Sequence, residues 1–359
     1  MTLAYSPNAA ALLTVVGATL VTALVVPLVR RLGLRWGLVD APDSRKQHTL
    51  PMVRLGGVGM VVGFSLALTL TWALGGFADL PLSKDRLIWT VLAGSLCYFV
   101  IGLADDLFAL PPLPRLAAQL AVAMAVWAEG VRIGSIDLAW NGLGGGNLTL
   151  ADPLSLLATV VWLVGITNAI NWLDGLDGLA AGVGGIAAVG LLAVSFTLHQ
   201  SAAGLLAAAL AGACLGFLRH NFNPARIFMG DGGSYFLGFA LAAISIVGPA
   251  KGLTSVSLLL PLLILSLPLA DMSAVIMGRL REGRSPFYPD RRHLHHRLLR
   301  AGFSQRRTVV LIYAFTQWLA ALALVLADVP LRFLWLGLAT AVLVGVGGAT
   351  RRFVQQQDE

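Results

Sequence analysis

Charged residues are scarce in this sequence. Asp, Glu, Lys and Arg make up 12% of the 359 residues, whereas 57% are hydrophobic and the mean hydropathy is +0.80. In an ordinary water-soluble domain about a quarter of the residues are charged. The shortage of charge therefore excludes a soluble domain and predicts a polytopic membrane protein.

Cysteine is nearly absent, and so is a cleavable leader pattern. Cys97 and Cys214 both lie within apolar runs, where a thiol behaves as a small packing residue, so we expect neither a disulfide nor a cysteine-ligated metal. No basic segment precedes the first apolar run, and Arg30, Arg31 and Arg35 follow it instead. This order of charges predicts a first helix that is retained.

Long apolar runs are abundant. We expect about eleven transmembrane helices, because that many runs are long enough to cross the hydrocarbon core. They cover residues 9–29, 55–76, 87–104, 114–130, 153–170, 179–198, 202–218, 235–248, 254–277, 308–327 and 331–349. Between the fourth and fifth, residues 131–151 alternate around a Gly-rich turn, which predicts a small β-hairpin. The chain is thus expected to be all-α, with one integral membrane domain over residues 1–359.

Basic residues fall mostly on one side of these spans. Roughly twenty of the 25 Lys and Arg residues lie in segments that follow odd-numbered helices, and such residues accumulate in cytoplasmic loops. This predicts an N-terminus outside, a cytoplasmic C-terminus and an extracytoplasmic hairpin. These basic cytoplasmic loops then account for the net charge of +7 and the pI near 10.0. The expected partner is the lipid bilayer. Nucleic acid is not expected, because no basic helix or interleaving of aromatic and basic residues is present.

Five polar segments reach the same predicted cytoplasmic face, namely residues 30–54, 105–113, 168–178, 219–234 and 278–307. Because carboxylates at a membrane boundary are costly to desolvate, such clustering indicates a functional site. A transporter would more often hold ionisable groups near the midplane, on broken helices of paired repeats. No such repeat is visible in the sequence.

Two of these segments hold acidic candidates, namely the adjacent Asp105 and Asp106 in one and the single Asp231 in the other. Asp105 and Asp106 end a helix, where the dipole disfavours acids; paired carboxylates raise one pKa or recruit a cation, although a pair facing water is the alternative. Asp231 lies among glycines, a position that suits either a helix cap or Mg²⁺ and phosphate binding. Nearby, Asn221 suits hydrogen bonding to a base and Phe228 suits stacking on one, with core packing as the alternative for Phe228.

The segment at 168–178 has acids and amides at every third position. Asn168, Asn171, Asp174 and Asp177 would form one stripe if the segment is helical. Oxygen ligands without Cys or His favour a hard cation such as Mg²⁺. The alternative is a polar loop in which these side chains serve as caps.

The loop at 278–307 and the first loop, residues 30–54, carry basic side chains and histidines. Imidazoles among many arginines resist protonation and donate hydrogen bonds to anions, so we expect phosphate or pyrophosphate binding; zinc and a patch for anionic lipid are the alternatives. The candidates are Lys46, His48, Arg54, His293, His295, His296 and Arg297. Oxygen ligands, cations and a membrane boundary together predict phosphoryl transfer between a nucleotide-linked donor and a lipid phosphate.

The motifs resemble those of the polyprenyl-phosphate N-acetylhexosamine-1-phosphate transferase family nearly end to end. They are D-x-P-D-x-R-K-x-H at 40–48, P-x-x-R-x-G-G at 51–57, the acid pair at 105–106, N-A-x-N-x-x-D-G-x-D-G-L-A at 168–180, M-G-D-x-G-S at 229–234 and H-L-H-H at 293–296. The resemblance implies transfer of a sugar-1-phosphate from a UDP-sugar to undecaprenyl phosphate, with release of UMP. It also implies a Mg²⁺ cofactor, with Mn²⁺ as a substitute, in the bacterial cytoplasmic membrane; a homodimer is left open.

The same resemblance implies roles for individual residues. Asp105 would deprotonate the lipid phosphate, and Asp106 would support it or the metal. Asp231 and Asn171 would be the Mg²⁺ ligands. Asn221 and Phe228 would contact uracil, and the stretch 293–300 would read the pyrophosphate and sugar. We expect direct attack of the lipid phosphate on the donor's β-phosphate, with a covalent aspartyl intermediate as the alternative.

The first loop indicates which branch of the family is closest. It resembles the branch that uses UDP-N-acetylglucosamine to initiate cell-surface polysaccharides, although Met52, Val53 and Arg54 lack the second proline of the P-x-P-R form frequent there. The branch that transfers phospho-MurNAc-pentapeptide in peptidoglycan synthesis, whose loop reads differently, is the alternative enzyme. A non-catalytic transporter or binder of lipid phosphate is the alternative from another class.

Overall fold

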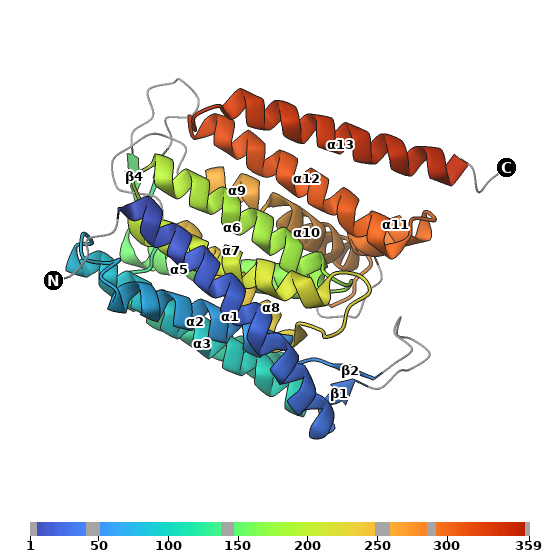
Figure 1. Ribbon diagram of the computed structural model, residues 1–359, viewed down its shortest axis with the longest axis horizontal. Helices are drawn as coiled ribbons and strands as arrows, with labels where there is room; N and C mark the ends of the chain where they lie inside the picture. Colours follow the sequence, from blue (N-terminus) through green and yellow to red (C-terminus); the bar gives the residue numbers. More distant parts are fainter. Residues whose placement is uncertain (1–5, 41–50, 138–146, 248–258, 286–291, 356–359) are drawn as a thin grey trace.

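The computed structural model describes residues 6–40, 51–137, 147–247, 259–285 and 292–355, and within them the chain is a bundle of helices (Figure 1). These helices are α1 (Pro7–Arg35), α2 (Gly56–Ala73), α3 (Leu82–Phe108), α4 (Pro112–Ala128), α5 (Asp152–Leu173), α6 (Leu179–Thr197), α7 (Ser201–Asn221), α8 (Gly230–Val247), α9 (Leu259–Ile264), α10 (Ser266–Arg281), α11 (Leu294–Arg300), α12 (Gln305–Leu326) and α13 (Arg332–Gln355). In this part of the chain nine are long and apolar enough to cross a membrane, and α4 is a shorter apolar helix. The prediction of an all-α polytopic membrane protein is confirmed.

The helix starts follow local chemistry. Ser6 caps α1 by accepting a hydrogen bond from the Ala9 backbone N–H at 3.3 Å, and Pro7 occupies the first helical position, where its missing N–H costs nothing. Ser304 caps α12 in the same way. These short-range signals explain why the apolar runs located most helices to within a few residues.

The ninth expected span, 254–277, is interrupted where it is described. α9 ends at Ile264 and α10 begins at Ser266. Pro268 has no N–H to donate to the carbonyl of Ile264, and its ring crowds that carbonyl. The expectation of one continuous helix is therefore wrong here, and the break lies just before the turn that carries Asp271.

Small residues let the central helices pack closely. In the 18-residue apolar stretch of α8, 94% of the residues are buried. In that of α13, which packs on α12 at the edge of the bundle, only 11% are buried. α1 packs against α7, where a Cβ added at Gly212 would lie 2.4 Å from the Val15 carbonyl oxygen. In membranes such small-residue contacts replace the hydrophobic effect as the basis of helix association.

Two short strand pairs lie at opposite ends of the bundle (Figure 1). β3 (Ser135–Asp137) pairs antiparallel with β4 (Asn147–Thr149), with Ile136 opposite Leu148, which confirms the predicted hairpin. β1 (Val39–Asp40) pairs antiparallel with β2 (Met52–Val53) and follows α1. This second pair was not expected, because two-residue strands have no periodic signal.

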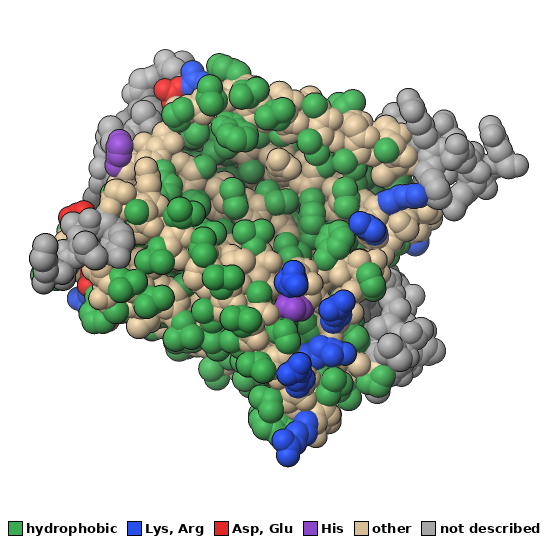
Figure 2. Space-filling model, viewed as in Figure 1, with side chains coloured by type: hydrophobic (Ala, Val, Ile, Leu, Met, Phe, Trp, Pro, Cys, Tyr) green, Lys and Arg blue, Asp and Glu red, His purple; other side chains and the backbone are tan. Residues whose placement is uncertain are grey.

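One end of the bundle is basic. α1 begins at one end and α13 finishes at the other (Figure 1). Figure 2 shows Lys and Arg gathered near the end of α1, while hydrophobic side chains cover the middle of the same face. The exposed arginines from α1, α7 and the segment after α7 are Arg30, Arg31, Arg35, Arg219 and Arg226.

Candidate active site

The acid pair closes the last turn of α3, and its two members face different partners. Asp105 accepts hydrogen bonds from the Leu110 backbone N–H at 2.9 Å and from the Arg115 guanidinium of α4. Asp106 accepts a hydrogen bond from the Gly232 backbone N–H of α8 at 2.9 Å. Its other oxygen, Oδ1, is buried without a hydrogen-bond partner among the described residues. Asp105 thus joins α3 to α4, whereas Asp106 faces the start of α8.

Asp231 lies in the first turn of α8. The sequence predicted this helix from residue 235, with Asp231 in the preceding loop; the helix in fact begins at Gly230, so that boundary was wrong. Gly230 has a φ of +76°, and a Cβ there would lie 2.0 Å from the Arg54 carbonyl oxygen. Only glycine fits this approach, which brings the segment containing Arg54 against the acidic end of the bundle.

Asn171 connects α5 to this acid. Its amide nitrogen donates hydrogen bonds to Asp231 Oδ1 at 2.7 Å and to the Ser234 hydroxyl at 2.9 Å. The two residues predicted from the family resemblance as metal ligands are therefore in direct contact, although they are 60 positions apart in the sequence. Their assignment as ligands stays a prediction.

Asp174 completes an acidic cluster with Asp106 and Asp231. Removal from water, together with the negative charges of nearby acids (Asp231, Asp106 and Asp177), raises the pKa of Asp174 to about 7, although the positive charge of Arg54 opposes the rise. Several negative charges in one buried site are energetically unfavourable unless positive charges are nearby. Arg54 supplies one positive charge, as the first-loop motif suggested.

The prediction that four polar side chains form one helical stripe is wrong, because only the first two of them lie in the helix. α5 ends at Leu173, so Asn168 and Asn171 are helical, Asp174 follows the helix, and Asp177 lies in the next loop. Asn168 donates instead to the Gln119 side chain of α4 at 2.8 Å. Asp177 Oδ2 accepts from the Asn223 amide and from the Ala225 backbone N–H, both at 3.0 Å. Helix rotation and termination send the four side chains to different partners.

Replacing Asp177 with alanine is expected to lower the free energy of unfolding by about 1–3 kcal/mol, because the Ala225 N–H and the Asn223 amide lose their acceptor. Asp177→Asn is the matched control, since its amide oxygen still accepts both bonds. Thermal unfolding in detergent measures both variants. Equal melting temperatures for Asp177→Ala and the wild type would show that this loop contact contributes nothing.

The two predicted uracil contacts hold loops together. Asn221 is 3% exposed; its amide oxygen accepts from the Gly178 backbone N–H at 3.0 Å, and its amide nitrogen donates to the Ile227 carbonyl at 2.9 Å. Phe228 is half-buried, and its backbone N–H donates to the Val53 carbonyl at 2.9 Å. Base recognition by either side chain stays a prediction. In this structure the amide oxygen and the amide nitrogen of Asn221 each already make a hydrogen bond within the protein.

The histidines reach the same end of the bundle through α11. His295 is 1% exposed, and its Nε2 would lie 2.5 Å from a Cβ placed on Gly175, in the loop beside Asp174. Burial, with smaller contributions from His296 and His293, lowers the pKa of His295 to about 4. It is therefore neutral at physiological pH, as predicted, although burial rather than the neighbouring arginines is the main cause.

Two other residues predicted to bind phosphate are more exposed than His295. Arg297 is exposed on α11, and His296 is half-buried beside His295, with ring centroids 4.3 Å apart. Lys46 and His48 lie outside the described residues. The structure thus brings together residues from all five of the predicted polar segments, namely Arg54, Asp106, Asn171, Asp174, Asp231 and His295.

The donor set fits Mg²⁺ better than zinc. In the described ranges no three His, Cys, Asp or Glu side chains form a group that could hold a metal ion by themselves. Mg²⁺ is usually held by one or two carboxylates together with substrate phosphates and water. The buried, unpartnered Oδ1 of Asp106 next to the Asp231 turn provides an oxygen of that kind.

Comparison with known proteins shows which family this chain belongs to. Residues 88–249 match glycosyl transferase family 4. The chain is 36% identical over 315 residues to the decaprenyl-phosphate N-acetylglucosaminephosphotransferase of Mycolicibacterium smegmatis, covering 82% of this chain and 77% of that protein. The chain belongs to the polyprenyl-phosphate N-acetylglucosamine-1-phosphate transferase family.

Other relatives agree. A decaprenyl-phosphate N-acetylglucosaminephosphotransferase of Mycobacterium tuberculosis is 37% identical over 320 residues, with 82% of this chain and 77% of that protein covered. An undecaprenyl-phosphate alpha-N-acetylglucosaminyl 1-phosphate transferase of Salmonella typhi is 30% identical over 311 residues, with 84% and 80% covered. The expected family is confirmed, and the protein is a membrane-embedded phosphotransferase.

Sequence reasoning missed two contributors to the transferase site. Arg115 pairs with Asp105 and lies 6.0 Å from the centre of the Tyr235 ring; only its position ten residues after the acid, one helix turn into α4, could have suggested this. Asp271 of α10 pairs with His293, whose Nδ1 lies 2.8 Å from Oδ2 of the acid. No local pattern links residues on different helices.

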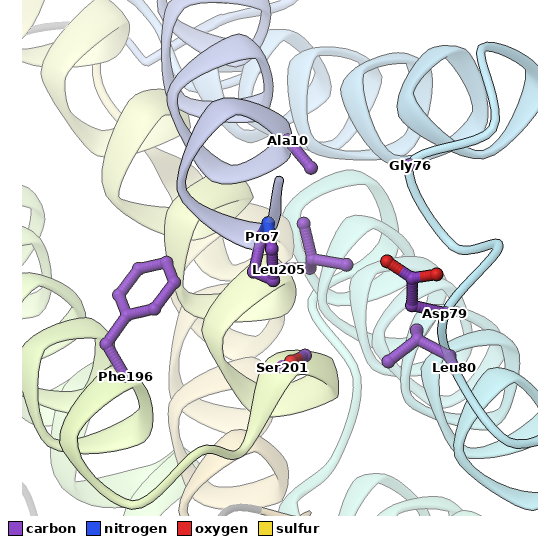
Figure 3. Close-up of a pocket in the computed structure, with 8 residues that line it drawn as sticks. All are labelled: Pro7, Ala10, Gly76, Asp79, Leu80, Phe196, Ser201 and Leu205. Carbon is purple, nitrogen blue, oxygen red and sulfur yellow. The ribbon is translucent and has the colours of Figure 1, made fainter. Parts of the chain in front are cut away.

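A pocket at the other end of the transferase lies far from this chemistry. The first turn of α1, the loop after α2, the end of α6 and the start of α7 surround it (Figure 3). Its lining is largely apolar, and Asp79 and Ser201 are its polar side chains. Since α1 starts here and finishes at the basic end, the pocket and the acidic cluster lie at opposite ends of the bundle.

Proposed function

We propose that this transferase moves N-acetylglucosamine-1-phosphate from UDP-N-acetylglucosamine to undecaprenyl phosphate, releasing UMP, and so initiates a cell-surface polysaccharide. The single observation that carries this proposal is the convergence of Asp106, Asp174 and Asp231 with Arg54 at one end of a lipid-embedded bundle. The relatives named above act on polyprenyl phosphates with this sugar, which supports the choice of both substrates.

We also propose that this end faces the cytoplasm of a bacterial inner membrane. The exposed arginines of α1 and α7 lie at this end, and basic residues are retained on the cytoplasmic side. The donor is a charged nucleotide, so a site on that side meets it without transport. The β3–β4 hairpin would then lie outside the cell.

In the proposed reaction the lipid phosphate oxygen attacks the β-phosphorus of the donor, and the bond to the UMP oxygen breaks. Mg²⁺, held by Asp231 and Asn171, would neutralise negative charge on the pyrophosphate when bound. Arg54 and the α11 segment bind and orient the phosphates. His295 is neutral and contributes hydrogen-bonding groups without adding charge.

The two acids of α3 divide the remaining work. Both Asp105 oxygens are already hydrogen-bonded, to Leu110 and Arg115, so this carboxylate orients the end of α3 and holds the arginine. Asp106 has a buried, unpartnered oxygen beside Asp231, so it is the better placed to accept a proton from the lipid phosphate or to contact the ion. The role of Asp105 as the base stays a prediction that this geometry favours less.

Purified protein is expected to release UMP when given undecaprenyl phosphate and UDP-N-acetylglucosamine, and to stop when EDTA removes divalent cations. Excess Mg²⁺ should restore the rate, and Mn²⁺ should do so in part. Omission of the lipid is the control for simple hydrolysis of the donor. Release of UMP from UDP-MurNAc-pentapeptide but not from UDP-N-acetylglucosamine would place the protein in the peptidoglycan branch instead. No release from either donor would favour a non-catalytic lipid-phosphate binder.

A further inference from the structure

A buried acid in α10 is bonded to the beginning of α11. Asp271 Oδ1 accepts a hydrogen bond from the Leu294 backbone N–H at 2.6 Å, and Oδ2 lies 2.8 Å from Nδ1 of His293. The Asp271 side chain is 8% exposed and that of His293 is 9% exposed. Both carboxylate oxygens are therefore engaged within one small, water-poor contact between the two helices.

The chemistry of these partners fixes the position of a proton. The Leu294 N–H can only donate, and both oxygens of an ionised carboxylate can only accept. The Nδ1 atom of His293 must therefore carry a hydrogen. A neutral imidazole that is protonated on Nδ1 has a lone pair on Nε2, on the opposite edge of the ring.

Contacts of the ring extend from this pair to the acidic cluster. His293 meets the Trp172 ring edge-on, with centroids 5.8 Å apart, and stacks on His295 at 5.7 Å with an angle of 6° between the planes. His295 in turn packs against Gly175, the residue that follows Asp174. The His293 ring thus contacts the 171–175 segment directly at Trp172 and indirectly, through His295, at Gly175.

We propose that Asp271 is a positioning residue that holds His293 in its Nδ1-protonated form, with the Nε2 lone pair available to a hydroxyl or amide N–H of the donor sugar. This inference rests on the proposed function, because it assigns a partner to the transferase site. Outer carboxylates that orient a histidine commonly matter to activity although they do not touch the substrate. Here the acid and the imidazole come from different helices.

Asp271→Asn tests the inference with almost no change of shape. The Leu294 N–H takes the amide oxygen of the new side chain, so the amide NH₂ faces Nδ1 and moves the imidazole proton to Nε2. A donor at Nε2 then meets a donor on the sugar, and the KM for UDP-N-acetylglucosamine is expected to rise about tenfold, the effect of one lost hydrogen bond. The KM for undecaprenyl phosphate should stay within about twofold of the wild type, because the lipid phosphate makes no contact with Nε2 in this proposal.

A second readout does not depend on catalysis. ¹⁵N-histidine NMR of the full-length protein, with the His293 signals assigned through His293→Gln, should show hydrogen on Nδ1 in the wild type and on Nε2 in Asp271→Asn. Asp85→Asn is the matched control, since Asp85 accepts a hydrogen bond from the Trp89 indole at 2.9 Å on the first turns of α3, at the opposite end of that helix from the acid pair. It should leave the His293 signals and both KM values unchanged.

The outcomes are distinct. If Asp271 acts through His293, Asp271→Asn should add little to the effect of His293→Gln; additive losses would indicate a purely structural role and would overturn the inference. A wild-type His293 with hydrogen on Nε2, including an imidazolium, also overturns it. If the protein releases no UMP from either sugar nucleotide, the proposed function fails, yet the spectrum still decides the tautomer.

Discussion

Asp231→Asn is expected to lower kcat for UMP release by about a hundredfold to a thousandfold, the usual cost of removing one group that stabilises charge in a transition state. Asparagine keeps the shape of the side chain and still accepts the hydrogen bond from Asn171, which the wild type makes at 2.7 Å. What is lost is the negative charge at the first turn of α8. Because the proposed role of that charge is to hold Mg²⁺, raising the Mg²⁺ concentration should recover part of the activity.

The assay is steady-state UMP release at increasing Mg²⁺, with folding checked by gel filtration and thermal unfolding. Asp152→Asn is a suitable control, because Asp152 is an exposed acid in the first turn of α5 that lies 3.5 Å from Arg132, at the end of α5 that is remote from Asn171. Its turnover should equal that of the wild type. Unchanged turnover in Asp231→Asn would rule out the metal assignment, and a loss that Mg²⁺ does not relieve would point to a role other than ion binding.

Gly102→Ala is expected to lower both stability and activity through packing alone. A Cβ at this position of α3 would lie 2.2 Å from the carbonyl oxygen of Asp231 and 2.5 Å from its carbonyl carbon. Backbone atoms cannot rotate away as a flexible side chain can, so α3 and α8 must separate. Forcing extra volume into a packed interior costs about 1–3 kcal/mol, and the separation would pull Asp106 away from Gly232.

We therefore expect Gly102→Ala to lower the melting temperature and to reduce activity at least tenfold even in the folded fraction, since a shift of about 1 Å at a reacting site costs up to a hundredfold. Gly165→Ala is the matched control, because a Cβ on this glycine of α5 meets no atom within 4 Å. Alanine is the better helix former by about 1 kcal/mol, so the control should be neutral or slightly stabilising. If both variants behave alike, the close α3–α8 contact is not what limits activity.

The two substitutions show how far sequence reasoning reaches. Asp231 could be selected from sequence, because an acid at a membrane boundary is costly and so suggests function. Gly102 could not be selected, because nothing in IGLADD distinguishes it from a glycine that faces open space. Its importance comes from the approach of a backbone more than 120 residues later in the chain, an approach that only the packed bundle creates.

The segment at 168–178 shows the same limit within one motif. The three-residue spacing of Asn168, Asn171, Asp174 and Asp177 predicts one helical face only if the whole segment is helical, and the helix ends at Leu173. The loop that follows this helix end takes its direction from partners elsewhere in the chain, since Asp177 accepts hydrogen bonds from Asn223 and Ala225 in the loop after α7. Spacing therefore selected four polar side chains, but it could not predict that they bond to different partners.

The sequence by itself determined the class of the protein, most of its apolar helices, the small hairpin and the family, because hydrophobic runs, turns and motifs are local features of the chain. The tertiary structure alone decided that Asp106, Asn171, Asp174, Asp231 and Arg54 meet, that Asp105 is tied to Arg115, and that Asp271 pairs with His293. These pairings depend on how each helix is rotated and how closely its neighbours approach. Side-chain volumes across the whole bundle set both, and no stretch of sequence contains them.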